Sequence, residues 1–404
     1  MPVSGGCIGT AQRWRWKSLR LLLKWVVMCA PLVVQAQSAQ PPTPAARRSV
    51  DAPTIVLKES LTCRGCKVVA RSVAVITDSL FDISFEFSLV VGQDARGRLL
   101  VTGRKAIGVF DSAGRFIKSL TRYGSGPGEF RQPFQFVVGP GDSLFVSDIA
   151  LSRVSVFDPT FTTLARTVSV PRLTEFLPRA DGQLTLGGYV ATKEGAGQPL
   201  HVVSRSGGVV RSFGTDSAIV GHDPRRTLAR SLVSRANGDV LAAERDRYRL
   251  SVWGNDSGLR RVFERHAIWF PGTGPEARVD HFARTASPPQ LYAIASTRDP
   301  NILLVNIVMP RKDYKPDPRL QGSRGEVGIK PNKPIGLYVN DYFDTIIEFL
   351  DLEQGTVLAS SRLRGIYGPI SHSPLHWRIQ ERPDGNLELA IVRFELVRSA
   401  TSPQ

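Results

Sequence analysis

The chain has 404 residues, of which 42% are hydrophobic and 22% are charged, and it contains 36 glycines and 28 prolines. This composition excludes an intrinsically disordered chain and is typical of a turn-rich globular protein. An excess of 52 lysines and arginines over 36 aspartates and glutamates gives a net charge of +16. Such a charge favours acidic partners but does not define a site for them.

Residues 1–36 are predicted to be a secretory signal peptide. A basic stretch, Arg13–Arg20, precedes an apolar run, Leu21–Val34, and the small-residue pattern Val34-Gln35-Ala36 follows. These three parts in this order are the features of a cleaved signal. The apolar run is shorter than the roughly 20 residues that span a membrane, so we expect no transmembrane segment in the mature chain. Residues 37–53, rich in proline and alanine, are predicted to be a flexible tether.

The predicted export of the protein limits the kinds of partner that it can meet. An exported basic protein meets anionic polysaccharide, phospholipid headgroups or lipopolysaccharide, and we therefore expect no nucleic-acid partner in the periplasm or outside the cell. A lipid anchor at Cys29 is an alternative, although Met28 stands where such signals have a small residue. A solvated basic surface without a specific ligand is the simpler interpretation of the charge.

From Thr54 onward, short β-rich runs alternate with turns. A strand, a Gly/Asp/Asn turn and a second strand recur six times. The six copies are Asp94–Leu99, Pro140–Leu144, Ala180–Leu184, Ala236–Val240, Arg298–Ile302 and Pro383–Leu387. Most are spaced near the roughly 40 to 50 residues of one propeller blade, and insertions account for the longer intervals.

A second hairpin follows each of the first five turns. These hairpins are Val109–Phe116, Val156–Phe161, Val202–Val209, Val252–Leu259 and Glu348–Thr356. Two hairpins make one four-stranded antiparallel blade, so the sixth blade lacks a pair of strands. We expect Thr54–Leu61 and Lys67–Val75 to supply them as a hairpin and to close the ring. The prediction is an all-β, monomeric, six-bladed β-propeller over residues 54–398, with residues 399–404 as a C-terminal tail.

One stretch carries a family resemblance. The connector Tyr123–Phe130, with the sequence Tyr-Gly-Ser-Gly-Pro-Gly-Glu-Phe, the strand Leu144–Asp148 and the segment Arg153–Asp158 together resemble one unit of an NHL-type six-bladed β-propeller. The resemblance implies a binding platform. Some such propellers are lyases, lactonases or hydrolases, so the fold alone does not choose among these functions.

Cys63 and Cys66 are the only cysteines after the predicted signal. Residues i and i+3 of a turn lie within about 7 Å, inside the range that a disulfide requires, and an oxidising compartment favours the bond. A zinc site is disfavoured because no second cysteine pair or nearby histidine completes it. A haem attachment would need histidine where Lys67 stands, and a redox role would place the pair at the start of a helix.

Catalytic motifs are absent: the chain has no Gly-x-Ser-x-Gly, His-Glu-x-x-His or phosphate loop. One constellation remains. Asp148, Glu244 and Asn306 stand at equivalent places in the second, fourth and fifth blades, where oxygen ligands from three blades would meet near one mouth of the channel and hold calcium. The alternative interpretation of Asp148 is an acceptor for the backbone of its turn.

A long segment interrupts the fifth blade. It runs from Pro310 to Pro334, and its basic residues are candidates for contacts with an anionic ligand. The candidate residues are Arg311, Lys312, Lys315 and Arg319. A solvated insertion is the alternative. His372 and His376 lie in the last connector and are expected at the surface.

The sequence therefore predicts an exported, non-catalytic binding module for a protein, peptide or glycan, with no cofactor. The alternative is a metal-assisted lyase, lactonase or hydrolase that uses Ca²⁺ or another divalent cation at the channel mouth. A deep mouth that gathers Asp148, Glu244 and Asn306 would favour the enzyme. A patch of arginine and aromatic residues would favour the binding module.

Overall fold

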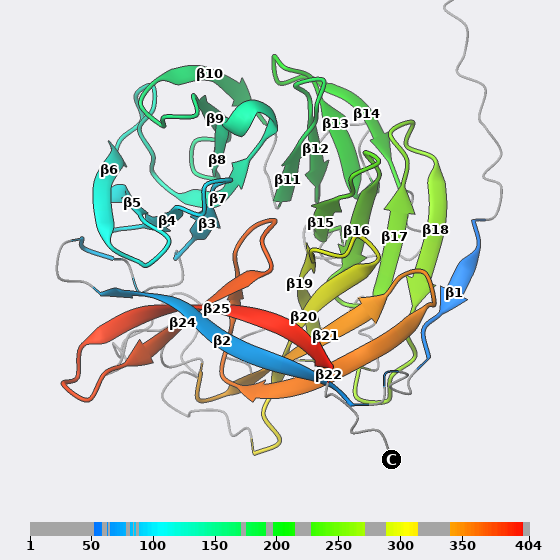
Figure 1. Cartoon of the computed structure of the whole chain (residues 1–404). Coiled ribbons are helices and arrows are strands. Elements are labelled where there is room, and N and C mark those ends of the chain that lie inside the picture. The colour runs from blue at the N-terminus through cyan, green and yellow to red at the C-terminus, as the bar shows by residue number, and fades with distance from the viewer. Residues whose placement is uncertain are drawn as a thin grey trace, which may run out of the picture. The chain divides into compact units, whose positions relative to one another are not determined.

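The computed structural model describes residues 52–58, 63, 65–77, 81–83, 85, 89–170, 175–190, 197–214, 228–270, 288–313 and 340–398. All of them belong to one compact unit, Ser49–Gln404. This unit consists of six mainly antiparallel sheets arranged as blades in a ring, and its only described helix is a single 3-10 turn, η1 (Pro140–Asp142) (Figure 1). The predicted six-bladed β-propeller is thus confirmed. Among the described residues, no helix is long and apolar enough to cross a membrane.

The first three blades follow one another along the chain, each with its first strand nearest the ring centre. Blade 1 has β3 (Val91–Gln93), β4 (Leu99–Thr102), β5 (Ala106–Phe110) and β6 (Phe116–Arg122). Blade 2 has β7 (Pro133–Val138), β8 (Leu144–Asp148), β9 (Arg153–Phe157) and β10 (Leu164–Ser169). Blade 3 has β11 (Glu175–Pro178), β12 (Leu184–Gly187), β13 (Leu200–Val203) and β14 (Val209–Phe213).

Of the other three blades, blades 4 and 6 each include one strand from the beginning of the chain. Blade 4 has β15 (Arg230–Ser234), β16 (Val240–Glu244), β17 (Arg249–Trp253), β18 (Leu259–Glu264) and the added β1 (Thr54–Val56). Blade 5 has β19 (Gln290–Ser296), β20 (Ile302–Pro310), β21 (Phe343–Asp351) and β22 (Thr356–Arg364). Blade 6 has β23 (Gly368–Pro369), β24 (Leu375–Glu381), β25 (Leu387–Arg398) and β2 (Cys66–Thr77).

The hydrophobic core is divided among the interfaces between neighbouring blades. Each of the six described clusters of buried apolar side chains lies between one pair of consecutive blades, including blades 6 and 1. Between blades 1 and 2, for example, Val109 packs with Phe136 and Val146. Because both faces of a blade are covered, the middle strands are buried on both sides, as in β8, where all residues are buried.

Ring closure follows the prediction only in part. β2 pairs antiparallel with β25 from Cys66↔Arg398 to Thr77↔Glu388, so a strand from each end of the described chain shares blade 6. The predicted N-terminal hairpin is wrong, because β1 instead pairs parallel with β18 in blade 4. Leu57, directly after β1, is buried in the cluster between blades 4 and 5, and this burial fixes β1 at the free edge of β18.

The expected division of blade 6 is also wrong. The turn Pro383–Leu387 joins the second and third strands, β24 and β25, whereas the other five turns join first and second strands. The C-terminal region therefore supplies three strands and the N-terminal region supplies one. The cause is β23, which has two residues, one of them a proline that cannot donate to a ladder, so the sequence shows no strand there.

Candidate functional site

A cavity of about 300 Å³ lies at the centre of the ring. Its walls come from the inner strands of all six blades, from β20 and β24, and from residues that follow β8, β16 and β23. The described lining residues are Leu89–Val91, Gln132–Gln135, Ile149, Glu175, Ser231, Arg245, Tyr292–Ala295, Leu304, Pro369–Ser373, His376 and Trp377. The cavity is thus a product of the whole ring, and no single blade contains it.

The turn between β23 and β24 crosses the centre of the ring. It is the orange segment that enters the middle of the ring in Figure 1. His372 at its tip has a positive φ of 58°, the left-handed conformation that suits a tight turn. Ser373 Oγ donates a hydrogen bond to Gln93 Oε1 at 2.9 Å, which connects this turn of blade 6 to blade 1.

His372 reaches from blade 6 to blade 2. Its Nε2 lies 3.2 Å from Gln135 Nε2, and Gln135 Oε1 accepts a hydrogen bond from the Phe176 backbone N–H at 3.0 Å. Because that N–H can only donate, the amide group must turn its NH₂ toward the imidazole. His372 Nε2 is then an acceptor, and the ring is neutral with its proton on Nδ1. Burial agrees with this state, since it lowers the pKa of His372 to about 4.

His376 is the second histidine of the cavity. Its side chain is 1% exposed, so the expected surface position is wrong. Burial lowers its pKa to about 4, and its ring packs edge-on against Phe394 with centroids 4.9 Å apart. Neither ring nitrogen has a hydrogen-bond partner among the residues that the structure describes.

Glu175 is the only carboxylate among the described lining residues. Burial raises its pKa to about 7, and contacts with the Leu232 N–H and the Ser231 hydroxyl, together with the charge of Arg245, oppose this rise. Ser231 Oγ also accepts a hydrogen bond from the Ile294 N–H at 3.2 Å. Polar groups of blades 3, 4 and 5 therefore meet at the cavity wall.

Arg245 is the only guanidinium among the described lining residues, and it lies directly after β16. Its side chain makes no hydrogen bond or ion pair with any residue in the described part of the chain. Tyr292 on β19 is nearby: burial raises its pKa, and the positive charge of Arg245 opposes the rise. The phenol is therefore neutral at ordinary pH and available as a donor beside the guanidinium.

The three predicted metal ligands are not among the residues that line the cavity. Asp148 accepts hydrogen bonds from backbone N–H groups of its own blade. The donors are Arg131 and Gln132, at 2.6 and 3.2 Å from Oδ2, and Leu151, at 3.0 Å from Oδ1. Asn306 lies within β20 and donates from Nδ2 to the carbonyl of Tyr367 at 2.8 Å.

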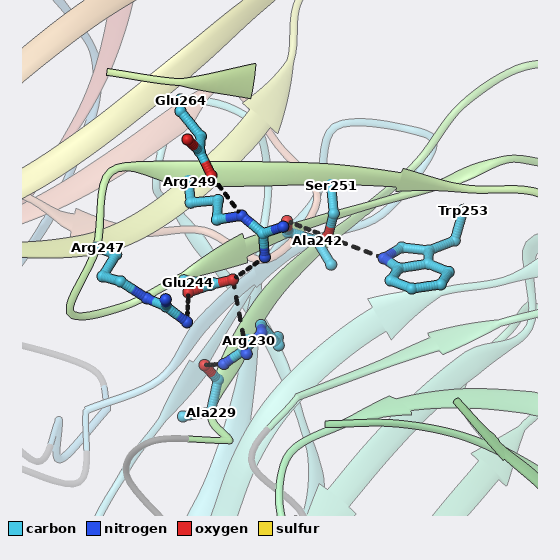
Figure 2. A network of polar contacts seen from close by, with 9 residues as sticks. All are labelled: Ala229, Arg230, Ala242, Glu244, Arg247, Arg249, Ser251, Trp253 and Glu264. Atoms are coloured by element: carbon cyan, nitrogen blue, oxygen red, sulfur yellow. Dashed lines mark hydrogen bonds and ion pairs between the residues drawn. The ribbon is translucent and has the colours of Figure 1, made fainter. Parts of the chain in front are cut away.

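Glu244 is surrounded by arginines. Arg247 Nη2 and Arg249 Nη1 approach its two oxygens at 2.7 and 2.8 Å, and Arg230 Nη2 lies 3.9 Å away (Figure 2). Arg249 also pairs with Glu264 at 2.8 Å. Three guanidiniums around one carboxylate make a cationic environment that disfavours a metal ion. In the described part of the chain, no group of three or more His, Cys, Asp or Glu side chains is placed to hold one.

The other predicted residues that the structure describes are not among those that line the cavity. Cys63 and Cys66 form a disulfide, with Cα atoms 5.4 Å apart. Arg311 Nη2 pairs with Asp313 Oδ2 at 2.7 Å, which uses part of its charge locally. Lys312 is exposed. The predictions for Lys315 and Arg319 lie outside the described residues.

Sequence reasoning missed Glu175, Arg245 and Tyr292. The sequence pointed to the neighbourhood of Arg245, because this residue directly follows Glu244, which stands at an equivalent place in its blade to Asp148 and Asn306 in theirs. Glu175 and Tyr292 lie near the starts of inner strands, in runs that read only as β-structure. Their meeting depends on the order of blades in the ring, which no local pattern encodes.

Comparisons with known proteins agree with this architecture. A family model described as a six-bladed β-propeller, DUF5128, matches residues 88–195. A comparison with curated protein sequences found no match.

Solved structures are similar over most of the chain. A member of the DUF4221 family from Bacteroides vulgatus is 11% identical, with a TM-score of 0.58 over 83% of this chain and 99% of its own. A protein from Bacteroides fragilis described as exported is 13% identical, with a TM-score of 0.53 over 85% and 99% of the two chains. At these identities the likeness shows the fold alone.

Proposed function

We propose that this protein is an exported, non-catalytic, NHL-type binding propeller whose ligand, a protein, peptide or glycan, inserts a small part of itself into the cavity at the ring centre. The observation that carries the proposal is the cavity, which is lined by all six blades and contains one guanidinium without a partner among the described residues. Pockets of this size with a few convergent polar groups in an apolar wall are the usual form of ligand sites.

The lining suits recognition more than chemistry. Tyr292 and Trp377 offer aromatic surfaces, while Arg245, Gln135 and Ser231 offer hydrogen-bonding groups. The two histidines are held neutral by burial, and His372 Nε2 is already used by Gln135. A general acid or base must reach the reacting proton, and the engagement of His372 argues for a structural role for that residue.

Two further observations support export and the repeat type. The N-terminal 36 residues have the pattern of a cleaved signal, and one similar fold is that of a protein described as exported. The NHL-like unit Tyr123–Phe130 lies inside the stretch matched by the six-bladed propeller family model.

A cavity-filling variant tests the proposal. Peptide and oligosaccharide libraries would be screened by ligand-observed NMR against the unmodified protein, against Ser371→Phe and against Ala293→Leu, both of which reduce the cavity. Ala113→Phe, at an exposed turn, is the control. We expect ligands of the unmodified protein and the control to lose binding to the filled variants. Equal binding to all four proteins would show that the ligand uses another surface and would refute the proposal.

A further inference from the structure

The cavity has a simple charge pattern. Of the described residues that line it, only Arg245 and Glu175 have side chains that carry charge at neutral pH. The imidazoles of His372 and His376 are neutral because burial lowers both pKa values. Tyr292 is neutral because burial raises its pKa. Asp246, next to Arg245, is not among the lining residues, and its pKa is also raised by burial.

Arg245 differs from the neighbouring arginines. Arg230, Arg247 and Arg249 direct their guanidiniums toward Glu244 (Figure 2). Arg245, on the next residue, forms no ion pair among the described residues, and the carboxylate on which its charge acts is Glu175, across the cavity wall. A guanidinium presents a planar fork of N–H donors that matches a carboxylate with two parallel hydrogen bonds. At the wall of a cavity, such a group is suited to an incoming anion.

Glu175 does not cancel this charge completely. Because burial raises its pKa to about 7, a large fraction of the side chain is protonated at neutral pH. A protonated carboxyl group can donate a hydrogen bond to an anion. An anion bound at Arg245 would favour the protonated form further, so binding should be accompanied by proton uptake.

Apolar side chains form about half of the exposed wall of the cavity. Leu89, Val91, Ile294 and Leu304 face the same space as the Trp377 ring. This apolar part of the wall favours a hydrocarbon or aromatic side chain over the hydroxyl groups of a sugar. The ligand group that satisfies both the guanidinium and this wall is a carboxylate one or two bonds away from an apolar side chain.

We propose that the cavity binds the C-terminal residue of a peptide, with Arg245 paired to the terminal carboxylate and the last side chain packed against Leu89, Ile294 and Trp377. The inference rests on the proposed function, because it names the ligand class of the same cavity. Binding places a free chain end in a partly open, partly apolar cavity, with its carboxylate at the exposed Arg245, and the need for a free carboxylate selects termini over internal segments of a chain.

A matched pair of probes tests the inference. N-acetylphenylalanine has the free carboxylate, and N-acetylphenylalanine amide has the same shape without the charge. We expect the acid to bind at least about tenfold more tightly than the amide in NMR titrations up to about 10 mM. Arg245→Gln should remove this preference and Arg245→Lys should retain part of it. Arg298→Gln, which removes an exposed arginine at the turn after β19, should behave like the unmodified protein.

The possible outcomes separate the two proposals. If acid and amide bind equally and Ser371→Phe blocks both, the carboxylate assignment is wrong while the cavity remains the ligand site. If neither is affected by cavity filling, both proposals fail. If D-galacturonate binds through Arg245 and N-acetylphenylalanine does not, the ligand is an acidic sugar, which contradicts the peptide assignment. Absence of binding by the acid at about 10 mM also contradicts it.

Discussion

Single side chains at the ring centre decide how the protein responds to pH. Glu175 has a folded-state pKa raised to about 7 from 4.5, so the folded protein holds more protons than the unfolded chain between these values. Its contribution to stability is therefore full below pH 4.5 and is lost as the pH rises through 7. His372 and His376, with pKa values lowered to about 4, act in the opposite direction, because their contribution is lost as the pH falls from 6.5 through 4.

The variant Glu175→Gln isolates the effect of Glu175 on the pH dependence of stability. Because glutamine does not titrate, the variant should be more stable than the unmodified protein at pH 8, by about 1 to 3 kcal/mol, and the difference should shrink toward pH 5. Thermal melting of both proteins from pH 5 to pH 8 measures this difference, and the histidine contributions cancel in the comparison. A difference that is constant across this range would show that Glu175 titrates normally.

Asp148→Asn tests the predicted metal site against the turn interpretation. The carboxylate accepts hydrogen bonds from three backbone N–H groups, two at Oδ2 and one at Oδ1. Asparagine has only one side-chain oxygen, so its NH₂ group would face the N–H donors at the other position. We expect the variant to lose about 1 to 3 kcal/mol of stability without added metal. Calcium should change the melting temperature of neither protein. Asp142→Asn, at an exposed residue of the same blade, is the control.

A calcium-dependent rise in the melting temperature that disappears in Asp148→Asn would contradict this expectation. It would instead favour the metal-assisted enzyme, because an ion that binds only the folded state stabilises it.

At the scale of elements, what the sequence could predict depended on strand length. The turns were recognisable because each needs residues tolerant of unusual backbone angles, such as Gly97 and Gly385, which both have φ of 80°. Most blade strands could be inferred from these turns. β1 lies within the predicted run Thr54–Leu61, but its partner β18 could not be inferred from three residues. β23 could not be inferred at all, because two residues show no periodicity. Glu175 and Arg245 were missed for a different reason, since their proximity arises only when blades 3 and 4 are adjacent in the ring.

Two truncations separate the roles of β1 and β2. A mature chain beginning at Cys63 lacks β1 but keeps β2 and the Cys63–Cys66 disulfide, and one beginning at Asp78 lacks both strands. The first should fold as a monomer with reduced stability, because it loses the buried Leu57, worth about 2 to 5 kcal/mol when such a side chain is removed. The second leaves one edge of β25 unpaired and should aggregate.

Size-exclusion chromatography and thermal melting of the two truncated chains provide the test. A synthetic peptide with the sequence of residues 65–77 should restore a monomer when added during refolding of the shorter chain. Cooperative, monomeric behaviour of the shorter chain without the peptide would show that β2 is not required for closure.

On the scale of the whole molecule, the core is a circle of six interfaces, and no blade is covered on both faces without its neighbours. Phe136 lies in the interface of blades 1 and 2, and Leu57 lies in that of blades 4 and 5. If the ring unfolds as one unit, a destabilising substitution at either place should lower the midpoint temperature of the same unfolding transition. The cavity should be lost in the same step, because all six blades form it.

Phe136→Ala and Leu57→Ala test this unity. Each should destabilise the protein by about 2 to 5 kcal/mol and shift a single calorimetric transition to lower temperature. Their effects should be additive within about 0.5 kcal/mol in the double variant, because the sites are in separate interfaces. A transition that splits in two in either variant would indicate that groups of blades unfold independently.

The pairing of β2 with β25 also imposes an order in time. Arg71 and Glu395 form an ion pair across these strands although they are 324 positions apart in the chain. During synthesis or N-terminus-first export, the segment that becomes β2 emerges before every blade and has no partner until the final strand arrives. Blade 6 is therefore the last to be completed, and the ring centre cannot be occupied before then. The waiting segment contains Lys67 and Arg71 on either side of its first apolar run, and charges on an unpaired strand discourage pairing with other chains during the interval.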